Sequence, residues 1–120
     1  MMMNAQEWID EGNGELALGE LDKALECYQK ATELEPECFD AWQAICVVLI
    51  KLNRAAEAIE AGQRAIELRP NDQMAYATMS LAYGRNHQIK EAEAMGAKAR
   101  IISWGGKVVP EGKAPGGEGT

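Results

Sequence analysis

The chain has 120 residues and a formal net charge of −7 at pH 7, a length that accommodates one small domain. An acidic chain without a stripe of Lys and Arg lacks the clustered cations that phosphate contacts need, which excludes nucleic acid as an expected partner. The longest apolar run, residues 44–50, is far shorter than the roughly 18 residues that predict a membrane span, and no secretory signal is visible at the start.

The first predicted helix covers residues 5–18. Asn4 precedes it and Glu7 follows three residues later, which is the spacing of a capping box. Its apolar side is expected to comprise Ala5, Trp8, Ile9, Gly12 and Leu16. A polar turn at residues 19–22 leads to a second helix over residues 22–35, which ends before Pro36 because proline cannot continue a helix. The inner side of this second helix is expected to comprise Ala24, Leu25, Tyr28, Ala31 and Leu34.

A second pair of helices follows at residues 41–52 and 55–69, joined by a turn at residues 53–54 and closed by Pro70. The first helix of this pair is apolar on nearly all sides, which is typical of a buried helix. A central position in the fold, with neighbours on both sides, would explain that composition.

A third pair is predicted at residues 73–85 and 89–103, with a turn at residues 86–88. Trp104 stands where a third proline would fall, and residues 105–120 are rich in Gly, Pro and Lys. Such a composition cannot bury enough apolar surface to fold alone. We therefore expect a tail after the last helix.

The three pairs repeat one another at a constant spacing. Four sets of positions share it: Trp8, Trp42 and Tyr76; Ala24, Ala58 and Ala92; Ala31, Ala65 and Ala99; Pro36 and Pro70. A regular period of this length predicts a solenoid of two-helix repeats. Small residues are needed where two helices touch, and Gly12, Cys46 and Ser80 are expected to occupy one such contact in successive repeats.

These positions resemble the tetratricopeptide repeat family, whose pattern runs aromatic, Leu-Gly, Tyr, Ala, aromatic, Ala and Pro. The matching residues are Trp8, Gly12, Ala24, Tyr28, Ala31 and Pro36 in the first repeat, Trp42, Ala58, Ala65 and Pro70 in the second, and Tyr76, Tyr83, Ala92 and Ala99 in the third. Ile45 in the second repeat and Met79 in the third replace the Leu of the pattern. The resemblance implies an all-α, right-handed solenoid of three helix-turn-helix repeats at residues 5–38, 39–72 and 73–104. A lead at residues 1–4 and the Gly/Pro-rich tail at residues 105–120 flank it.

The chain departs from the family pattern at several positions. Glu11 and Glu15 replace Leu and Tyr in the first helix, which suits a helix with one face in water. Gly62 and Gly96 replace the aromatic of the second helix, so either the helices approach more closely there or another side chain fills the space. Family members usually end in a polar capping helix, which this chain lacks. Apolar residues near the end, including Ile101, Ile102 and Trp104, are therefore candidates for self-association.

In the family, the first helix of each repeat lines a concave groove that binds a partner. By position, the resemblance implies a groove lined by Gln6, Ile9, Asn13, Asp40, Gln43, Val47, Ile50, Met74, Ala77, Leu81 and Arg85. Its apolar members suit an amphipathic helix or an extended apolar peptide. Some of them could equally belong to the core, since the middle helix is expected to be buried.

One group of relatives clamps the C-terminal carboxylate of chaperones with Lys, Asn and Arg side chains at five groove positions. In this chain those positions are Ile9, Asn13, Ala44, Met74 and Thr78, of which Asn13 alone matches. A carboxylate needs charge-assisted donors. The sequence therefore predicts that the groove does not bind a chaperone tail.

No catalytic, cofactor or metal constellation is evident in the sequence. His87 is the single histidine and lies in a predicted turn, and Cys27, Cys38 and Cys46 form no Cys-x-x-Cys pair. An odd number of cysteines cannot all pair within one chain. We expect reduced, packed cysteines in a cytoplasmic protein that is not an enzyme.

Two functions remain open: an adaptor that binds a partner protein in the groove, and a self-assembling scaffold. The second follows from charge, because residues 5–38 carry ten acidic and two basic side chains, a balance of −8, whereas residues 73–106 carry two and four, a balance of +2. Complementary ends suit head-to-tail contact. In a third alternative, a monomer covers its own exposed end with the tail through Trp104, Val108 and Val109.

Overall fold

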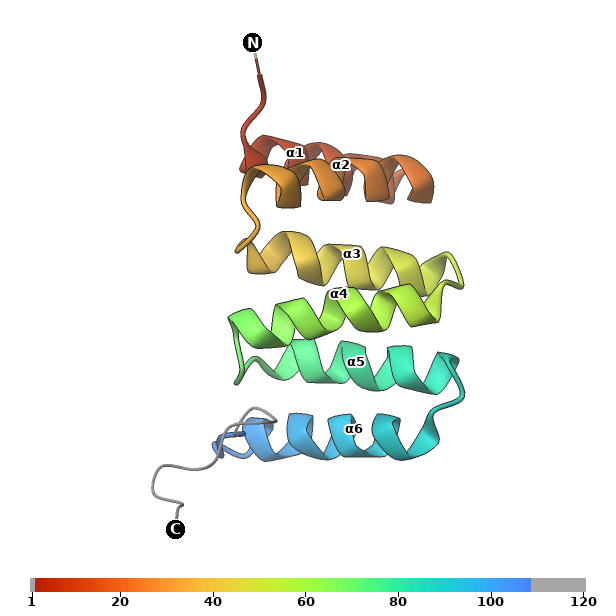
Figure 1. Ribbon diagram of the computed structural model, residues 1–120, viewed down its shortest axis with the longest axis vertical. Helices are drawn as coiled ribbons and strands as arrows, with labels where there is room; N and C mark the ends of the chain where they lie inside the picture. The colour runs from red at the N-terminus through yellow and green to blue at the C-terminus, as the bar shows by residue number, and fades with distance from the viewer. Residues whose placement is uncertain (1, 109–120) are drawn as a thin grey trace.

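A computed structural model describes residues 2–108, which form six helices and no strand. The helices are α1 (Ala5–Ala17), α2 (Leu21–Leu34), α3 (Phe39–Lys51), α4 (Ala55–Leu68), α5 (Gln73–Arg85) and α6 (Ile89–Ser103). They stack in chain order as three antiparallel pairs, and α1 and α6 lie at opposite ends of the stack (Figure 1). The all-α architecture of three helix-turn-helix repeats is thus confirmed.

The helix boundaries agree with the sequence for α5 and α6 and shift slightly for the other four helices. The first helix ends at Ala17 rather than residue 18, because Gly19 reverses the chain with a φ of 80°. The second covers Leu21–Leu34 rather than 22–35, and α4 ends at Leu68 rather than 69. The third begins at Phe39, two residues before the expected start, and ends at Lys51.

The helix ends follow the same repeat as the packing. Asn4 accepts a hydrogen bond from the Glu7 amide at 2.8 Å and the Glu7 side chain accepts one from the Asn4 amide at 2.9 Å, which confirms the capping box. The turns after α1, α3 and α5 place Gly19, Asn53 and His87, at equivalent positions of the three repeats, at φ values of 80°, 63° and 64°. Each turn returns two amide hydrogen bonds to the end of the helix before it, the pattern of a Schellman motif.

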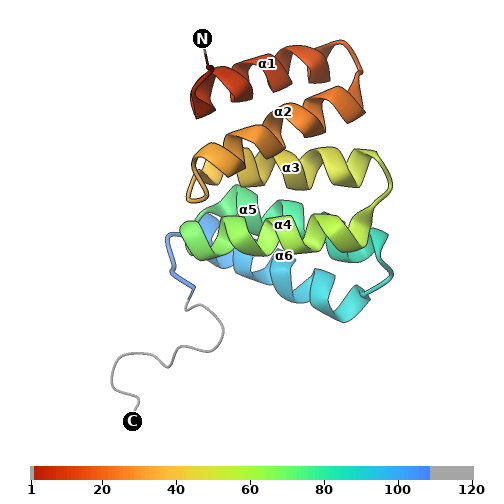
Figure 2. The ribbon, with the colours of Figure 1, turned by 45° about the horizontal axis from the view of Figure 1, so that its top comes forward.

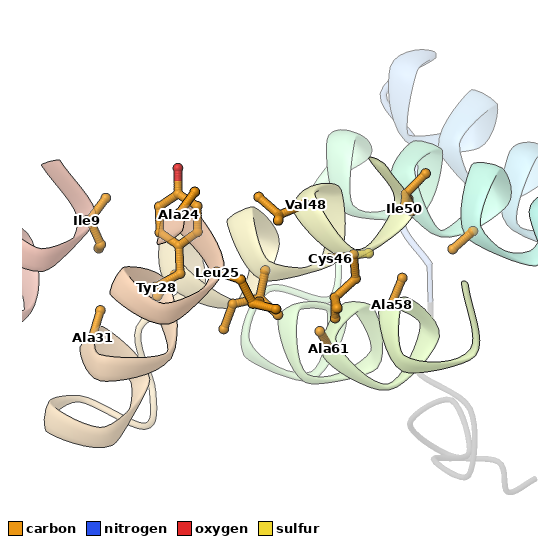
Figure 3. Packing of buried hydrophobic residues seen from close by; sticks show 14 of the residues in the cluster. Ile9, Ala24, Leu25, Tyr28, Ala31, Cys46, Val48, Ile50, Ala58 and Ala61 are labelled. Carbon is orange, nitrogen blue, oxygen red and sulfur yellow. The ribbon is translucent and has the colours of Figure 1, made fainter. Parts of the chain in front are cut away.

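The main core is formed mostly by the four helices from α1 to α4 and is built largely from small residues. Ala24, Ala31, Ala41 and Ala58 have no exposed surface. Figure 3 shows Cys46 of α3 directed toward α4, close to Ala58 and Ala61. As expected, α3 is deeply buried, with seven of its residues in the core. Leu34, expected on the inner side of α2, is instead 46% exposed, because it occupies the last turn where α2 leaves the stack.

Gly12 and Gly62 leave space at the helix contacts of the first two repeats, and different side chains fill it. In the first repeat, Gly12 receives the ring of Tyr28. In the second repeat the sizes are exchanged: Cys46 replaces Gly12, and Gly62 replaces Tyr28. A Cβ at Gly62 would meet Met79 of the next repeat, with its Cγ 3.0 Å away, and the Cys46 sulfur at 3.2 Å. A side chain from a neighbouring repeat therefore fills the space that the missing aromatic leaves.

Candidate functional site

The first helices of the three repeats share one face of the solenoid. α1 contacts α3, and α3 contacts α5, whereas among residues 2–108 the second helices α2 and α4 make no contact with each other. The first helices therefore converge and the second helices diverge, which makes the face lined by α1, α3 and α5 the concave one. In the view of Figure 2, α4 lies in front of α5 and α6.

The face between α3 and α5 is centred on a hydrogen bond from the Gln43 side-chain amide to the Thr78 hydroxyl oxygen, at 2.8 Å. Because residues three or four apart share a helix face, Met74, Ala77 and Leu81 lie around Thr78. These three residues are exposed, Met74 at 65% and Leu81 at 48%. The opposite face of α5 buries Tyr76, Met79 and Tyr83. α5 is thus apolar on both faces, and we name the exposed residues Met74, Ala77 and Leu81 the α5 stripe.

The remaining predicted groove residues divide into three groups. Gln6, Asn13, Asp40 and Arg85 are exposed or nearly so, and Gln43 and Val47 are half-buried. Ile9 and Ile50 are buried, with 6% and 4% of their surface exposed, so these two belong to the core and not to an open groove. The alternative that some groove positions serve the core is therefore correct for Ile9 and Ile50, because both enter the cluster formed by α1 to α4.

The polar groups on this face are largely paired with one another. The Tyr28 hydroxyl donates to Asn13 Oδ1 at 2.6 Å, and burial raises the Tyr28 pKa, which keeps this donor protonated. The Gln6 side chain donates to Asp10 Oδ1 at 3.0 Å. Gln43 Oε1 is buried and accepts no hydrogen bond from the described residues. An unpaired buried acceptor of this kind is costly.

The five carboxylate-clamp positions present little that could hold a carboxylate. Ile9 is buried, Met74 is apolar, and Asn13 and Thr78 are engaged by Tyr28 and Gln43. Ala44, the fifth position, has no polar side-chain atom.

Two surface hollows lie on the opposite side of the molecule. The larger, about 510 Å³, is lined by residues of α2, α3 and α4, including Trp42, and the smaller, about 250 Å³, includes Tyr76. Trp42 and Tyr76 hold equivalent positions in successive repeats, so the two hollows are equivalent by repeat. They follow from the divergence of the second helices, and the ion pair of Arg54 with Glu57 borders the larger one. The repeated geometry of the fold therefore accounts for the presence of both hollows.

One repeated feature of the structure went unpredicted. Lys30, Arg64 and Lys98, again one repeat period apart, place their cationic groups over the rings of Trp8, Trp42 and Tyr76 at 5.4, 5.5 and 6.0 Å from the ring centroids. The spacing of these cations could have revealed the interaction. In addition, Trp42 Nε1–H donates to the Pro36 carbonyl and the Tyr76 hydroxyl to the Pro70 carbonyl, both at 2.8 Å. The repeated aromatic thus joins each proline loop to the following helix.

The three cysteines are unpaired, and two of them are buried. Burial raises the pKa of Cys46 to about 12, and burial followed by nearby Glu11 raises that of Cys27. Thiols of this kind are poor nucleophiles and poor metal ligands. Within residues 2–108, no three His, Cys, Asp or Glu side chains are grouped as a metal site would require. None of the described helices is long and apolar enough to cross a membrane.

The apolar residues near the end of α6 differ in exposure. Trp104 is 78% exposed and Ile101 is 43% exposed, as a self-association surface would require. Ile102 is half-buried against Val108, so it is less accessible than expected. Val109, the other tail residue with an expected packing role, lies outside the described residues.

Comparisons with known proteins agree with this geometry. A family model described as a tetratricopeptide repeat matches residues 9–73. A curated relative is the human protein O-mannosyl-transferase TMTC3, 29% identical over 100 residues; the match takes in 82% of this chain and only 11% of that protein.

Solved structures of similar fold include the first tetratricopeptide domain of Spaghetti (RPAP3) bound to an HSP90 peptide. It shares a TM-score of 0.81 and 20% identity, and the match covers 82% of this chain and 79% of that one. A mutant of MamA shares a TM-score of 0.80 and 26% identity, over 90% of this chain and 62% of that one.

Proposed function

The chain belongs to the tetratricopeptide repeat family, and from that premise we propose that its concave face binds a peptide or helix of a partner protein. Members of the family are generally protein-interaction modules. The observation that carries the proposal is the α5 stripe, because contiguous apolar side chains left exposed beside a hydrogen-bonded helix contact mark an interaction surface. The human relative is named as a transferase, but the chain spans 11% of it, and we infer no enzymatic activity from that name.

The partner that fits this face is an amphipathic helix or an extended segment with two aliphatic anchors. Met74 and Leu81 lie about two helical turns apart on α5 and offer two separate apolar contacts. Arg85 continues the same side of α5 and supplies one cation for an acidic group on the partner.

A chaperone C-terminal tail is a poor fit in this proposal. Such a tail carries a terminal carboxylate, which needs charge-assisted donors, and the clamp positions Ile9, Asn13, Ala44, Met74 and Thr78 include no Lys or Arg. The HSP90 peptide in the Spaghetti structure is a ligand of that protein, and 20% identity transfers the fold alone. We propose that the protein acts in a reducing compartment such as the cytoplasm, because its three cysteines are unpaired.

The test is selection of binding peptides from a displayed library of random sequences, followed by affinity measurement on the chain and its variants. The Val47→Glu, Leu81→Glu double variant should weaken selected peptides at least tenfold, because it places two charges in the apolar contact. Leu34→Glu is a matched control, since Leu34 is 46% exposed and Leu81 48% exposed. If the selected peptides bind the double variant as tightly as the unaltered chain, the proposal that the groove is the binding site is wrong.

Self-assembly is a second candidate, favoured by the exposed Trp104 and Ile101 at one end and the acidic first repeat at the other. Light scattering at low and high salt tests this candidate. Head-to-tail contact between charged ends should weaken as salt screens the charges. A mass that stays that of a monomer at all concentrations in low salt would contradict it.

A further inference from the structure

The chain reverses direction directly after α6. Gly105 adopts a φ of 89°, and its amide donates to the Ile102 carbonyl at 3.0 Å. The Gly106 amide donates to the Ile101 carbonyl at 2.9 Å, and a Cβ at Gly106 would lie 2.7 Å from Ile101 Cγ2. The two glycines therefore permit a tight turn that other residues would strain, and the chain is directed toward the loop between α4 and α5.

Val108 is held in place by both a hydrogen bond and apolar contacts. Its amide donates to Asn71 Oδ1 at 2.6 Å, and the residue is 8% exposed. Its cluster also contains Tyr76 and Ala99, with half-buried Ile66, Met95 and Ile102 packed against it. Val108 lies in a segment with the composition of a tail, yet it is as buried as many residues of the core.

The repeat period identifies what Val108 replaces. One repeat earlier, Ala75 of α5 packs with Ala65, and Leu68 is packed against the same cluster. Ala99 and Ile102 are the equivalents of Ala65 and Leu68 in the following repeat. Val108 therefore contacts α6 where Ala75, in the first turn of α5, contacts α4. It takes the position that the first helix of a following repeat would fill.

Among residues 2–108, no side chain from a following element reaches the rest of that surface at Gly96. At Gly62 of α4 a Cβ would meet Met79 from the following repeat, whereas at the equivalent Gly96 of α6 it would meet Ser80 Oγ at 3.5 Å and Arg100 Nη1 at 3.8 Å. The surface also carries a cation, because Arg100 lies beside Gly96. We name the face around Gly96 and Ala99 the α6 docking surface.

We propose that residues 106–108 are an internal ligand of the α6 docking surface, whose first contact they occupy, so that α1 of a second copy packs there only at higher protein concentration. The excluded copy is identified by charge, because exposed Glu7 and Glu11 of α1 complement exposed Arg100. This proposal is independent of the peptide-binding groove, because the groove residues lie on α1, α3 and α5 and the docking surface lies on α6.

The experiment compares the unaltered chain with Val108→Ser, Asn71→Ala and the matched control Lys107→Ser. Lys107 is exposed and adjacent to Val108, so its substitution leaves both contacts intact. By amide hydrogen exchange, Val108 should exchange at least tenfold more slowly than an unprotected peptide in the unaltered chain and in Lys107→Ser. Asn71→Ala should lose most of this protection.

Light scattering over a concentration series then tests the blocking role. Val108→Ser and Asn71→Ala should associate at concentrations where the unaltered chain and Lys107→Ser do not. Asn71 is exposed in a loop, so its variant keeps the fold and provides the result even if Val108→Ser unfolds. An unprotected Val108 amide in the unaltered chain, or equal masses for all four chains, would overturn the proposal. Affinity for groove peptides should not change in any of these variants.

Discussion

At the contact between the two helices of each repeat, the residues at two facing positions change together from one repeat to the next. Where the first repeat combines Gly12 with Tyr28, the second combines Cys46 with Gly62 and the third combines Ser80 with Gly96. The side-chain volume at the contact between the two helices of a repeat therefore depends on both positions together. In the second repeat Met79 completes the volume, so a substitution there affects two repeats at once.

Gly62→Ala should therefore reduce the free energy of unfolding by about 1–3 kcal/mol, because the added methyl overlaps Met79 and lies close to the Cys46 sulfur, both buried. Gly96→Ala is the matched control at the equivalent position of the third repeat. Its methyl would meet Ser80 Oγ at 3.5 Å, an ordinary contact, and alanine should stabilise the helix by up to about 1 kcal/mol. Urea unfolding of both variants measures the difference, and equal effects would disprove the packing argument.

The Cys46 thiol predicts how stability depends on alkaline pH. Its pKa is raised from 9.0 to about 12 by burial, so the folded state keeps a proton that the unfolded state loses above pH 9. Stability is retained below pH 9 and falls as the pH rises toward 12. Between pH 8.5 and pH 10, the unaltered chain should lose about 1 kcal/mol more than Cys46→Ala. Parallel pH profiles for the two chains would show that Cys46 is not sequestered.

At the scale of elements, the helix ends repeat as regularly as the helix interiors. The turn after each first helix requires one residue with positive φ, and the three repeats use Gly19, Asn53 and His87 there. The left-handed conformation is costly for residues other than glycine. His87 thus occupies the turn position that requires a positive φ.

His87→Gly should stabilise the chain by up to about 1 kcal/mol, because glycine adopts the observed φ of 64° without a steric cost. Gly19→Ala should destabilise it by a similar amount at the equivalent position. Thermal or urea unfolding provides the measurement. A destabilised His87→Gly variant would mean that the imidazole makes a contact that outweighs the backbone strain.

The repeat period made most of these elements predictable from sequence. Trp42 and Pro70 bounded the middle repeat, and helix ends shifted by no more than two residues. The site was less predictable, because whether Ile9 and Ile50 face the groove or the core depends on a rotation of the helix that apolar periodicity does not fix. The Val108 contact with Asn71, far away along the chain, has no signal in local sequence.

For the whole molecule, curvature separates two kinds of surface. The first helices converge on a face that keeps the α5 stripe exposed, and the second helices diverge and leave hollows that repeat with the fold. Exposed apolar surface on the converging face is the feature that packing alone does not require. The central claim is therefore that this face, and not the hollows or the end of α6, is where a partner binds.

The most direct measurement is amide chemical-shift mapping of the isotopically labelled chain with a selected peptide. We expect the largest shifts on α3 and α5 around Gln43, Val47, Thr78 and Leu81, and we expect Leu81→Glu to abolish them and Leu34→Glu to leave them unchanged. Largest shifts around Trp42 and Arg64 in the hollow between α2 and α4, or at Val108, with the α5 stripe unchanged, would contradict it.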